Sequence, residues 1–210
     1  MSKQKITSAP SVRRLPSYLH IIRQIQREGC EFISGTLIAH ELNLEPIQVR
    51  KDLSITGITG RPKRGYPVNE LIGAVERFLG WSTTRDAVLV GAGNLGTALM
   101  GYQEFQLHGL RLIAAFDIDP YKIGKHIHGV AVLAVETMES RIRGFGVKTA
   151  ILTVPSSQAQ GVAAALVSAG IQGIWNFTNV KLKVPDTVSV QNEDLSSGYA
   201  MLCVMMQGRE

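Results

Sequence analysis

A glycine-rich stretch, V-L-V-G-A-G-N-L-G-T-A-L at residues 88–99, most restricts how this chain can fold. It follows an apolar run, fits the pattern G-x-G-x-x-G and continues into a helix-forming segment at residues 97–106. In such a strand, turn and helix, the first glycine allows a tight turn, the second lets the backbone approach a pyrophosphate, and the third permits close helix–strand packing. The stretch therefore predicts the start of a Rossmann-type domain.

An acidic residue follows at the spacing that such a domain requires. The apolar segment L-I-A-A-F ends in Asp117, 21 residues after Gly96. A carboxylate there can accept hydrogen bonds from ribose hydroxyls and would repel the 2′-phosphate of NADP. The expected cofactors are therefore NADH and NAD⁺, held at the turn by Gly91, Ala92, Gly93, Asn94, Leu95 and Gly96.

Strand-like and helix-like segments then alternate to residue 177. This alternation predicts a doubly wound parallel sheet, which binds ligands at the carboxyl ends of its strands. The residues at those ends, and hence further candidates for nucleotide contact, are Thr153, Val154, Pro155, Asn176 and Phe177. Phe177 fits a core position equally well.

The N-terminal part reads as three short helices. The first is expected from Pro16 to Gly29, and Ser34 is a plausible N-cap of the second. In the third, E-P-I-Q-V-R-K-D-L-S, Val49 and Leu53 share one face, and the basic residues project from the other. This arrangement favours a helix-turn-helix over the alternative of an ordinary three-helix cluster with a charged exterior.

A basic, glycine-rich segment follows the third helix. I-T-G-I-T-G-R-P-K-R-G-Y-P-V predicts a hairpin wing that can grip DNA phosphates, with Tyr66 packed on the sugar backbone or on the domain. Residues 1–85 hold 13 Lys and Arg against 7 Asp and Glu, whereas residues 86–210 hold 9 against 10. This asymmetry indicates a polyanionic partner for the N-terminal part.

Other features exclude several classes of protein. The start, M-S-K-Q-K-I-T-S, lacks an apolar signal core, and no stretch approaches the roughly 18 apolar residues of a membrane helix, so a cytoplasmic location without membrane association is expected. Cys30 and Cys203 have no metal-ligand spacing and are expected to be buried thiols, and no metal site is predicted. An oxidoreductase would need an acid or base and a substrate domain, which the remaining 125 residues do not supply, so no enzyme is expected.

The last segment contains eight successive apolar residues, 199–206. One face of a surface helix cannot hide them all, so burial by another subunit or another domain is expected. A two-fold dimer would present two recognition helices to two DNA half-sites. The predicted domains are a winged helix at 1–85, a Rossmann-like domain at 86–190 and a terminal helix at 191–210.

Together these parts resemble the Rex family of bacterial redox-sensing transcriptional repressors over nearly the whole chain. The motifs that carry the resemblance are Q-V-R-K-D-L-S, G-R-P-K-R-G-Y, V-G-A-G-N-L-G-T-A-L, F-D-I-D-P, L-T-V-P, G-I-W-N-F and V-Q-N-E-D-L. The expected DNA-contacting residues are Gln48, Arg50, Lys51 and Ser54 in the third helix, and Arg61, Lys63, Arg64 and Tyr66 in the wing.

The resemblance implies an α/β homodimer with a domain-swapped C-terminal helix. Such a dimer binds an inverted-repeat operator when NADH is low and leaves it when NADH accumulates. The positions that match the switch elements of the family are Arg14, Tyr102 and Asp194. Two other readings remain open: an NAD-dependent oxidoreductase with a basic appendage, and a coenzyme-A-binding regulator.

Overall fold

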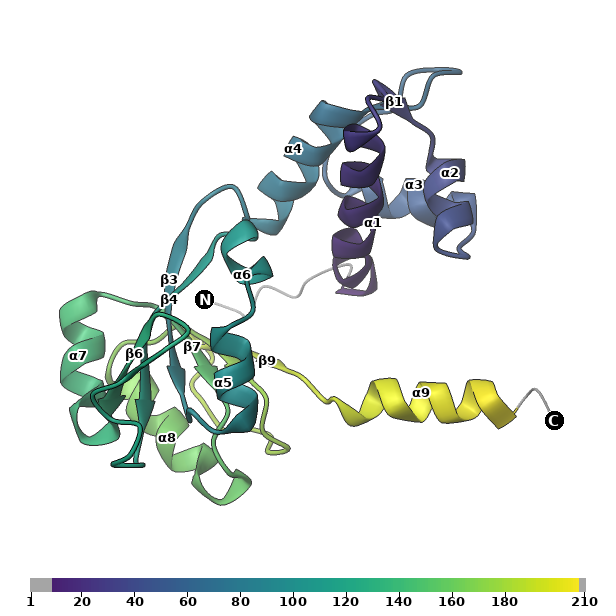
Figure 1. Ribbon diagram of the computed structural model, residues 1–210. Coiled ribbons are helices and arrows are strands. Elements are labelled where there is room, and N and C mark those ends of the chain that lie inside the picture. Colours follow the sequence, from purple (N-terminus) through teal and green to yellow (C-terminus); the bar gives the residue numbers. More distant parts are fainter. Residues whose placement is uncertain (1–8, 208–210) are drawn as a thin grey trace. The chain divides into compact units, whose positions relative to one another are not determined.

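The computed structural model describes residues 9–207, which divide into two compact units between Thr83 and Thr84 (Figure 1). Residues 1–8, where no signal peptide is expected, and residues 208–210 lie outside the described residues. The predicted fold class, a winged helix followed by an α/β Rossmann-like domain, is confirmed. Each unit has a hydrophobic core of its own.

The N-terminal unit is a helix-turn-helix closed by a two-stranded sheet. Its elements are α1 (Ala9–Arg27), β1 (Phe32–Ile33), α2 (Gly35–Glu41), α3 (Pro46–Ser54), β2 (Tyr66–Pro67) and α4 (Val68–Leu79). Ser34 caps α2 as expected, because its hydroxyl accepts from the Leu37 N–H at 3.0 Å. The core joins Tyr18 and Ile22 of α1 to Val49 and Leu53 of α3.

The first helix was expected to begin at Pro16, but α1 begins at Ala9 and contains that proline. The buried face continues upstream of the proline, since Ser11 and Leu15 are both buried. Packing of this extra length outweighs the one helical hydrogen bond that the proline removes.

The wing also differs from the expected hairpin. Within residues 55–65 the only pairing is the bridge between Arg61 and Gly65, and β2 pairs antiparallel with β1, which precedes α2. Gly65 has a φ of +87°, and a Cβ there would collide with the Ile33 carbonyl. The close approach of β1 therefore replaces a second wing strand.

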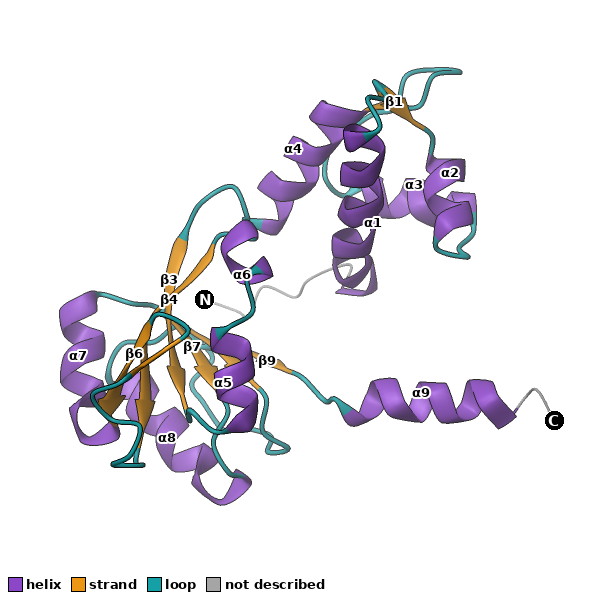
Figure 2. Ribbon diagram, in the orientation of Figure 1, coloured by secondary structure: helices purple, strands orange, loops and turns teal. Residues whose placement is uncertain are grey.

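The C-terminal unit is a seven-stranded sheet in the order β5-β6-β4-β3-β7-β8-β9 (Figure 2). The strands are β3 (Arg85–Val90), β4 (Leu110–Asp117), β5 (His126–Ile127), β6 (Val130–Ala134), β7 (Thr149–Leu152), β8 (Gly173–Asn176) and β9 (Ser189–Asn192). All pairs are parallel except β5 with β6. The chain runs outward from β3 in one direction and then, from β7, in the other, which makes β3/β7 a switch point.

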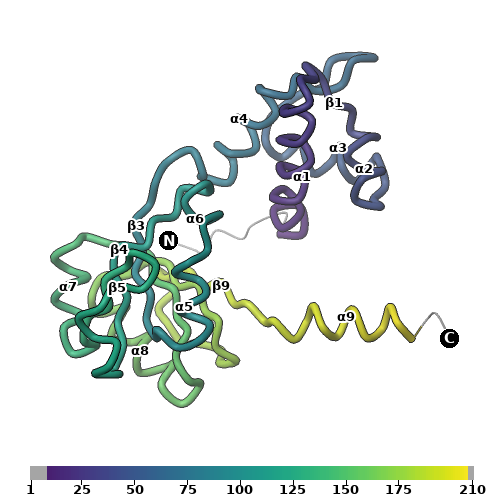
Figure 3. The backbone as a smooth tube through the Cα atoms, in the orientation of Figure 1, coloured from purple at the N-terminus to yellow at the C-terminus, as the bar shows by residue number. Residues whose placement is uncertain are grey.

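Helices cover both faces of this sheet. On one face lie α5 (Asn94–Met100) and α6 (Glu104–Leu107), and on the other lie α7 (Met138–Phe145), which follows the short helix η1 (Val135–Thr137), and α8 (Ser156–Ser168). The last helix, α9 (Ser196–Gln207), has no buried residue and projects away from the sheet (Figure 3). Val88 and Val90 face α7 and α8, whereas Leu89 faces α5 and α6, as the two-residue period of a strand requires.

The helix expected over 97–106 is interrupted, because α5 ends at Met100 and α6 begins at Glu104. Gly101 lies at the break, and a Cβ there would come within 2.9 Å of the His128 ring. The His128 ring therefore lies against the point from which a side chain at position 101 would project.

Candidate nucleotide site and nucleic-acid interface

The glycine turn lies between β3 and α5 and is shaped by close backbone contacts. Gly91 has a φ of +99°, and a Cβ there would lie 2.8 Å from the Thr153 carbonyl oxygen. A Cβ on Gly96 would collide with the Gly91 carbonyl, whereas one on Gly93 would meet nothing. Gly91 and Gly96 therefore allow the close backbone contacts of the turn, and open space lies beside Gly93.

A cavity of about 900 Å³ opens at this turn, at the carboxyl ends of β3, β4 and β7. Eight of the expected nucleotide residues line it: Gly91, Gly93, Leu95, Asp117, Thr153, Val154, Pro155 and Phe177. Eight further residues line it that were not expected as contacts: Val90, Phe116, Ile118, Lys122, Val135, Ser157, Gln158 and Val162. Five of these eight are apolar and give no sign of a ligand site, so only the motif spacing could have located them.

Asp117 is held in a fixed orientation by two backbone N–H groups. Its Oδ2 accepts from Ala92 N at 2.6 Å and its Oδ1 from Asp119 N at 2.8 Å. Lys122 is the one cation on the cavity wall among the described residues, and its Nζ lies 3.5 Å from Asp119 Oδ2. A neighbouring acid therefore offsets the charge of this lysine.

Four expected nucleotide residues do not line the cavity. Ala92 is buried and acts through its N–H, Gly96 is packed on Gly91, and Asn94 is exposed. Asn176 is fully buried: its Nδ2 donates to Val180 O and Asn192 Oδ1, and its Oδ1 accepts from Thr178. Its amide is therefore used to hold the chain beyond β8, which corrects its expected role as a contact residue.

An aromatic cluster runs from the cavity to Tyr102. Phe177 lines the cavity, and its ring centre lies 5.1 Å from that of Trp175, so Phe177 belongs both to the core and to the cavity wall. The ring centres of Trp175 and Phe105 are 5.5 Å apart, and those of Phe105 and Tyr102 are 4.9 Å apart. Tyr102 itself is 52% exposed.

The other two switch candidates have local partners. Asp194 Oδ1 accepts from Ser196 N at 2.8 Å, where α9 begins. Arg14 pairs with Asp52 inside the N-terminal unit. No hydrogen bond joins Tyr102 to Asp194 within the described part of the chain.

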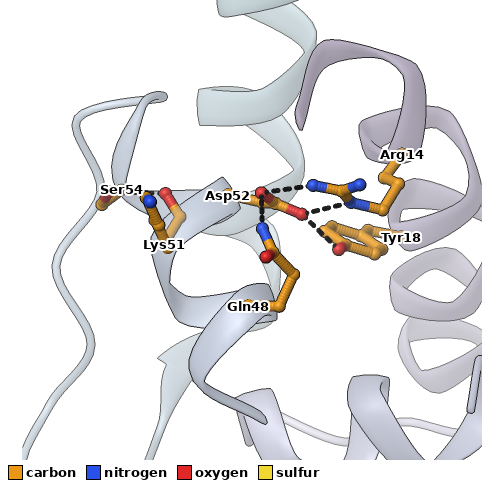
Figure 4. Close-up of polar contacts among 6 residues, drawn as sticks. All are labelled: Arg14, Tyr18, Gln48, Lys51, Asp52 and Ser54. Atoms are coloured by element: carbon orange, nitrogen blue, oxygen red, sulfur yellow. Dashed lines mark hydrogen bonds and ion pairs between the residues drawn. The ribbon is translucent and has the colours of Figure 1, made fainter. Parts of the chain in front are cut away.

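The outer face of α3 is basic. Arg50, Lys51 and Ser54 are exposed, while Val49 and Leu53 are fully buried. Gln48 is half-buried and donates from Nε2 to Asp52 Oδ1 at 2.7 Å. Figure 4 shows Lys51 and Ser54 on the opposite side of α3 from Asp52.

The wing carries its cations beside an aromatic ring. Arg61, Lys63 and Arg64 are exposed, and the Arg64 guanidinium lies 4.2 Å from the centre of the Phe32 ring. Tyr66 is only 8% exposed and lies against Gly60. Its ring packs on the domain, which corrects its expected place among the DNA-facing residues.

Asp52 was not singled out in the sequence, yet it is the most enclosed acid of the N-terminal unit. It is fully buried and accepts from Arg14 Nε at 2.6 Å, Arg14 Nη2 at 3.0 Å and Tyr18 OH at 2.6 Å. Nothing in the local sequence distinguishes it from a surface acid, because its main partners lie 34 and 38 residues away.

The described residues also bear on metal binding and membrane association. Residues 9–207 contain no group of three or more His, Cys, Asp or Glu that could hold a metal ion. No helix in that range is long and apolar enough to cross a membrane. Cys30 is exposed and Cys203 half-buried, so the expectation that both are buried thiols is wrong, because neither lies against a core.

A helix-turn-helix with a free basic face, joined to a Rossmann-type unit with a nucleotide-sized cavity, defines a ligand-responsive transcription regulator. Two family models match, "Putative DNA-binding protein N-terminus" at residues 6–54 and "CoA binding domain" at residues 82–180. Among curated proteins, the chain is 59% identical to the redox-sensing transcriptional repressor Rex of Treponema denticola, over 100% of both chains. It is 37% identical to Rex of Bacteroides fragilis, over 93% of this chain and 88% of that one.

Solved structures agree. RSP, a Rex-family repressor, superposes with a TM-score of 0.88 at 33% identity, over 98% of this chain and 96% of that one. RSP in complex with β-NAD⁺ and operator DNA superposes with a TM-score of 0.89 at 34% identity, over 98% and 95%. The chain belongs to the Rex family of redox-sensing transcriptional repressors. Membership confirms the expectation of a regulator in place of an oxidoreductase.

Proposed function

We propose that this chain represses transcription by binding operator DNA through α3 and the wing, and that NADH in the cavity of the C-terminal unit releases it. The observation that carries the proposal is the presence in one chain of a free basic recognition face and a nucleotide cavity at the switch point of the sheet. RSP has been solved with β-NADH and with β-NAD⁺ and operator DNA, which supports both halves.

The cavity residues suit an adenine dinucleotide. Gly93 leaves room for a pyrophosphate beside the turn, and Asp117 has a fixed carboxylate for the ribose hydroxyls. When bound, the dinucleotide brings a nicotinamide ring that is positively charged in NAD⁺ and neutral in NADH. Pro155 and Phe177 offer this ring an apolar wall.

Such a wall favours the neutral ring, because moving an unpaired charge into apolar surroundings is costly. We propose Tyr102 and Asp194 as the groups that sense the difference and Arg14 as the residue that links them to the N-terminal unit. The aromatic cluster from Phe177 to Tyr102 supports the position of Tyr102 in this set.

The working form is proposed to be a homodimer that exchanges α9. None of the α9 residues is buried, and the side chains of Tyr199, Met201, Leu202, Val204, Met205 and Met206 are 52–70% exposed. A second copy that covers them would also align two α3 helices with an inverted repeat. A repressor works where its operator lies, so we propose a cytoplasmic location.

The test is duplex binding by the full chain with separate additions of NADH, NADPH and coenzyme A. NADH should weaken binding and the other two should not. Coenzyme A is included because the matching family model is described as a CoA-binding domain. Release by coenzyme A with no NADH binding would replace the redox sensor with a coenzyme-A-responsive regulator.

A further inference from the structure

The buried carboxylate of Asp52 faces the interior from the same helix whose outer face is basic. It accepts from two nitrogen atoms of Arg14, from the hydroxyl of Tyr18 and from the amide of Gln48 (Figure 4), and Ser11 is a further donor. Burial alone would raise the pKa of Asp52. Hydrogen bonds from Arg14, Tyr18, Ser11 and Gln48 outweigh burial and hold this pKa well below its usual range.

An ionised carboxylate can only accept hydrogen bonds. Gln48 must therefore turn its amide nitrogen, and not its carbonyl oxygen, toward Asp52, and the 2.7 Å contact has this sense. The carbonyl oxygen of Gln48 points away from Asp52 in Figure 4. Asp52 thus fixes which atom of Gln48 is open to a ligand.

Gln48 lies where a recognition helix meets bases. It is in the N-terminal half of α3, one turn before the exposed Lys51, and the N-terminal residues of such helices contact base edges in the major groove. In that groove adenine N6 and cytosine N4 donate, whereas guanine O6 and thymine O4 only accept. The carbonyl oxygen of Gln48 can pair only with such an amino group, and the amide proton that Asp52 leaves over can donate beside it to an acceptor such as adenine N7.

We propose that Gln48 is a specificity-determining residue that accepts from the amino group of adenine or cytosine, and that Asp52 is the positioning residue that imposes this orientation. The inference rests on the proposed function of α3 as the DNA-reading helix. It assigns to Asp52 a role in specificity that a merely structural ion pair would not have.

The variants separate these roles. Gln48→Ala removes the acceptor. Asp52→Asn keeps the shape but offers Gln48 an N–H, so the Gln48 amide can turn over and present its own N–H groups. Arg23→Gln is the matched control: it breaks a 2.7 Å ion pair with Glu76 that joins α1 to α4 and does not touch α3.

The probe is a duplex that the wild-type protein selects from a randomised inverted-repeat library, scanned one base pair at a time. Gln48→Ala should lose roughly 3- to 10-fold of preference at one position per half-site, the value of one hydrogen bond. Replacing the adenine or cytosine there by a base analogue without the amino group should cost the wild type the same factor and Gln48→Ala nothing. Asp52→Asn should weaken or invert the preference at that position only, and Arg23→Gln should leave it unchanged.

The outcomes are distinct. An unchanged scan for Gln48→Ala would overturn the inference, as would equal losses for wild type and Gln48→Ala with the analogue, and neither result depends on Asp52→Asn folding. A uniform loss at all positions for a folded Asp52→Asn would reduce Asp52 to a structural residue and overturn its positioning role. If the wild type selects no sequence while Lys51→Ala binds as well as wild type, the proposed function fails and the inference with it.

Discussion

The carboxylate of Asp117 is proposed to select NADH over NADPH. Both oxygens are fixed by backbone N–H groups, and Lys122 is paired with Asp119 and so is not free to bind a 2′-phosphate. NADPH should therefore bind at least about tenfold more weakly than NADH, a difference of ~1.4 kcal/mol.

Asp117→Ala should reduce this selectivity in calorimetric titrations. Asp86→Ala is the control, because Asp86 pairs with Arg111 and does not line the cavity. Equal affinities of the wild type for the two nucleotides would contradict the ribose assignment.

Tyr18 makes stability depend on pH in the alkaline range. Burial, and then the hydrogen bond to Asp52, raise the pKa of Tyr18 from 10.0 to about 12. Its contribution is complete below pH 10 and is lost as the pH rises toward 12, a change on the order of 2 kcal/mol. Urea unfolding of the full chain at pH 8 and 11.5 measures it, and Tyr18→Phe should lose less stability between these values than wild type. Equal losses would show that the phenol does not titrate with folding.

At the scale of the element, the outer face of α3 should provide phosphate contacts. Lys51→Ala should lower DNA affinity for all sequences and reduce the salt slope by about one, because one fewer counterion is released. Lys148→Ala, an exposed lysine of the C-terminal unit, should change neither quantity. Unchanged binding of Lys51→Ala and Arg50→Ala at several salt concentrations would remove α3 from the interface.

Short-range sequence patterns were enough to predict the elements that carry the nucleotide cavity and the basic face of α3. Residues close in sequence define the G-x-G-x-x-G turn, the position of Asp117 and the buried and exposed faces of α3. All three features are present in the structure. What escaped depends on distant partners. The carboxylate of Asp52 accepts hydrogen bonds from Arg14 and Tyr18 of α1, and the side-chain amide of Asn176 donates to Asn192 of β9. The pairing of β2 with β1, which precedes α2 in the chain, likewise could not be read from the wing sequence.

For the whole molecule, α9 should hold two copies together. Met205→Glu places a charge among side chains that are 52–70% exposed in one chain, and its burial in a dimer would be costly. Light scattering should report a dimer for wild type and a monomer for Met205→Glu, with weaker binding to an inverted repeat. Phe145→Glu, on an exposed ring of α7, should remain dimeric. A dimeric Met205→Glu would exclude α9 from the interface.

We propose that the nucleotide is sensed and not consumed. A change of the two-state population from 1:99 to 99:1 needs a difference of about 10⁴-fold in NADH affinity between the states, and partial switching needs less. If Tyr102 and Asp194 sense the ring, Tyr102→Phe and Asp194→Ala should still bind the duplex but respond less to NADH.

The most direct measurement is the affinity of the full chain for its selected duplex as the NADH to NAD⁺ ratio is varied at constant total nucleotide. The affinity should fall steadily as the ratio rises. A flat response, with NADH binding demonstrated by calorimetry in the same buffer, would mean that the chain does not sense the ratio.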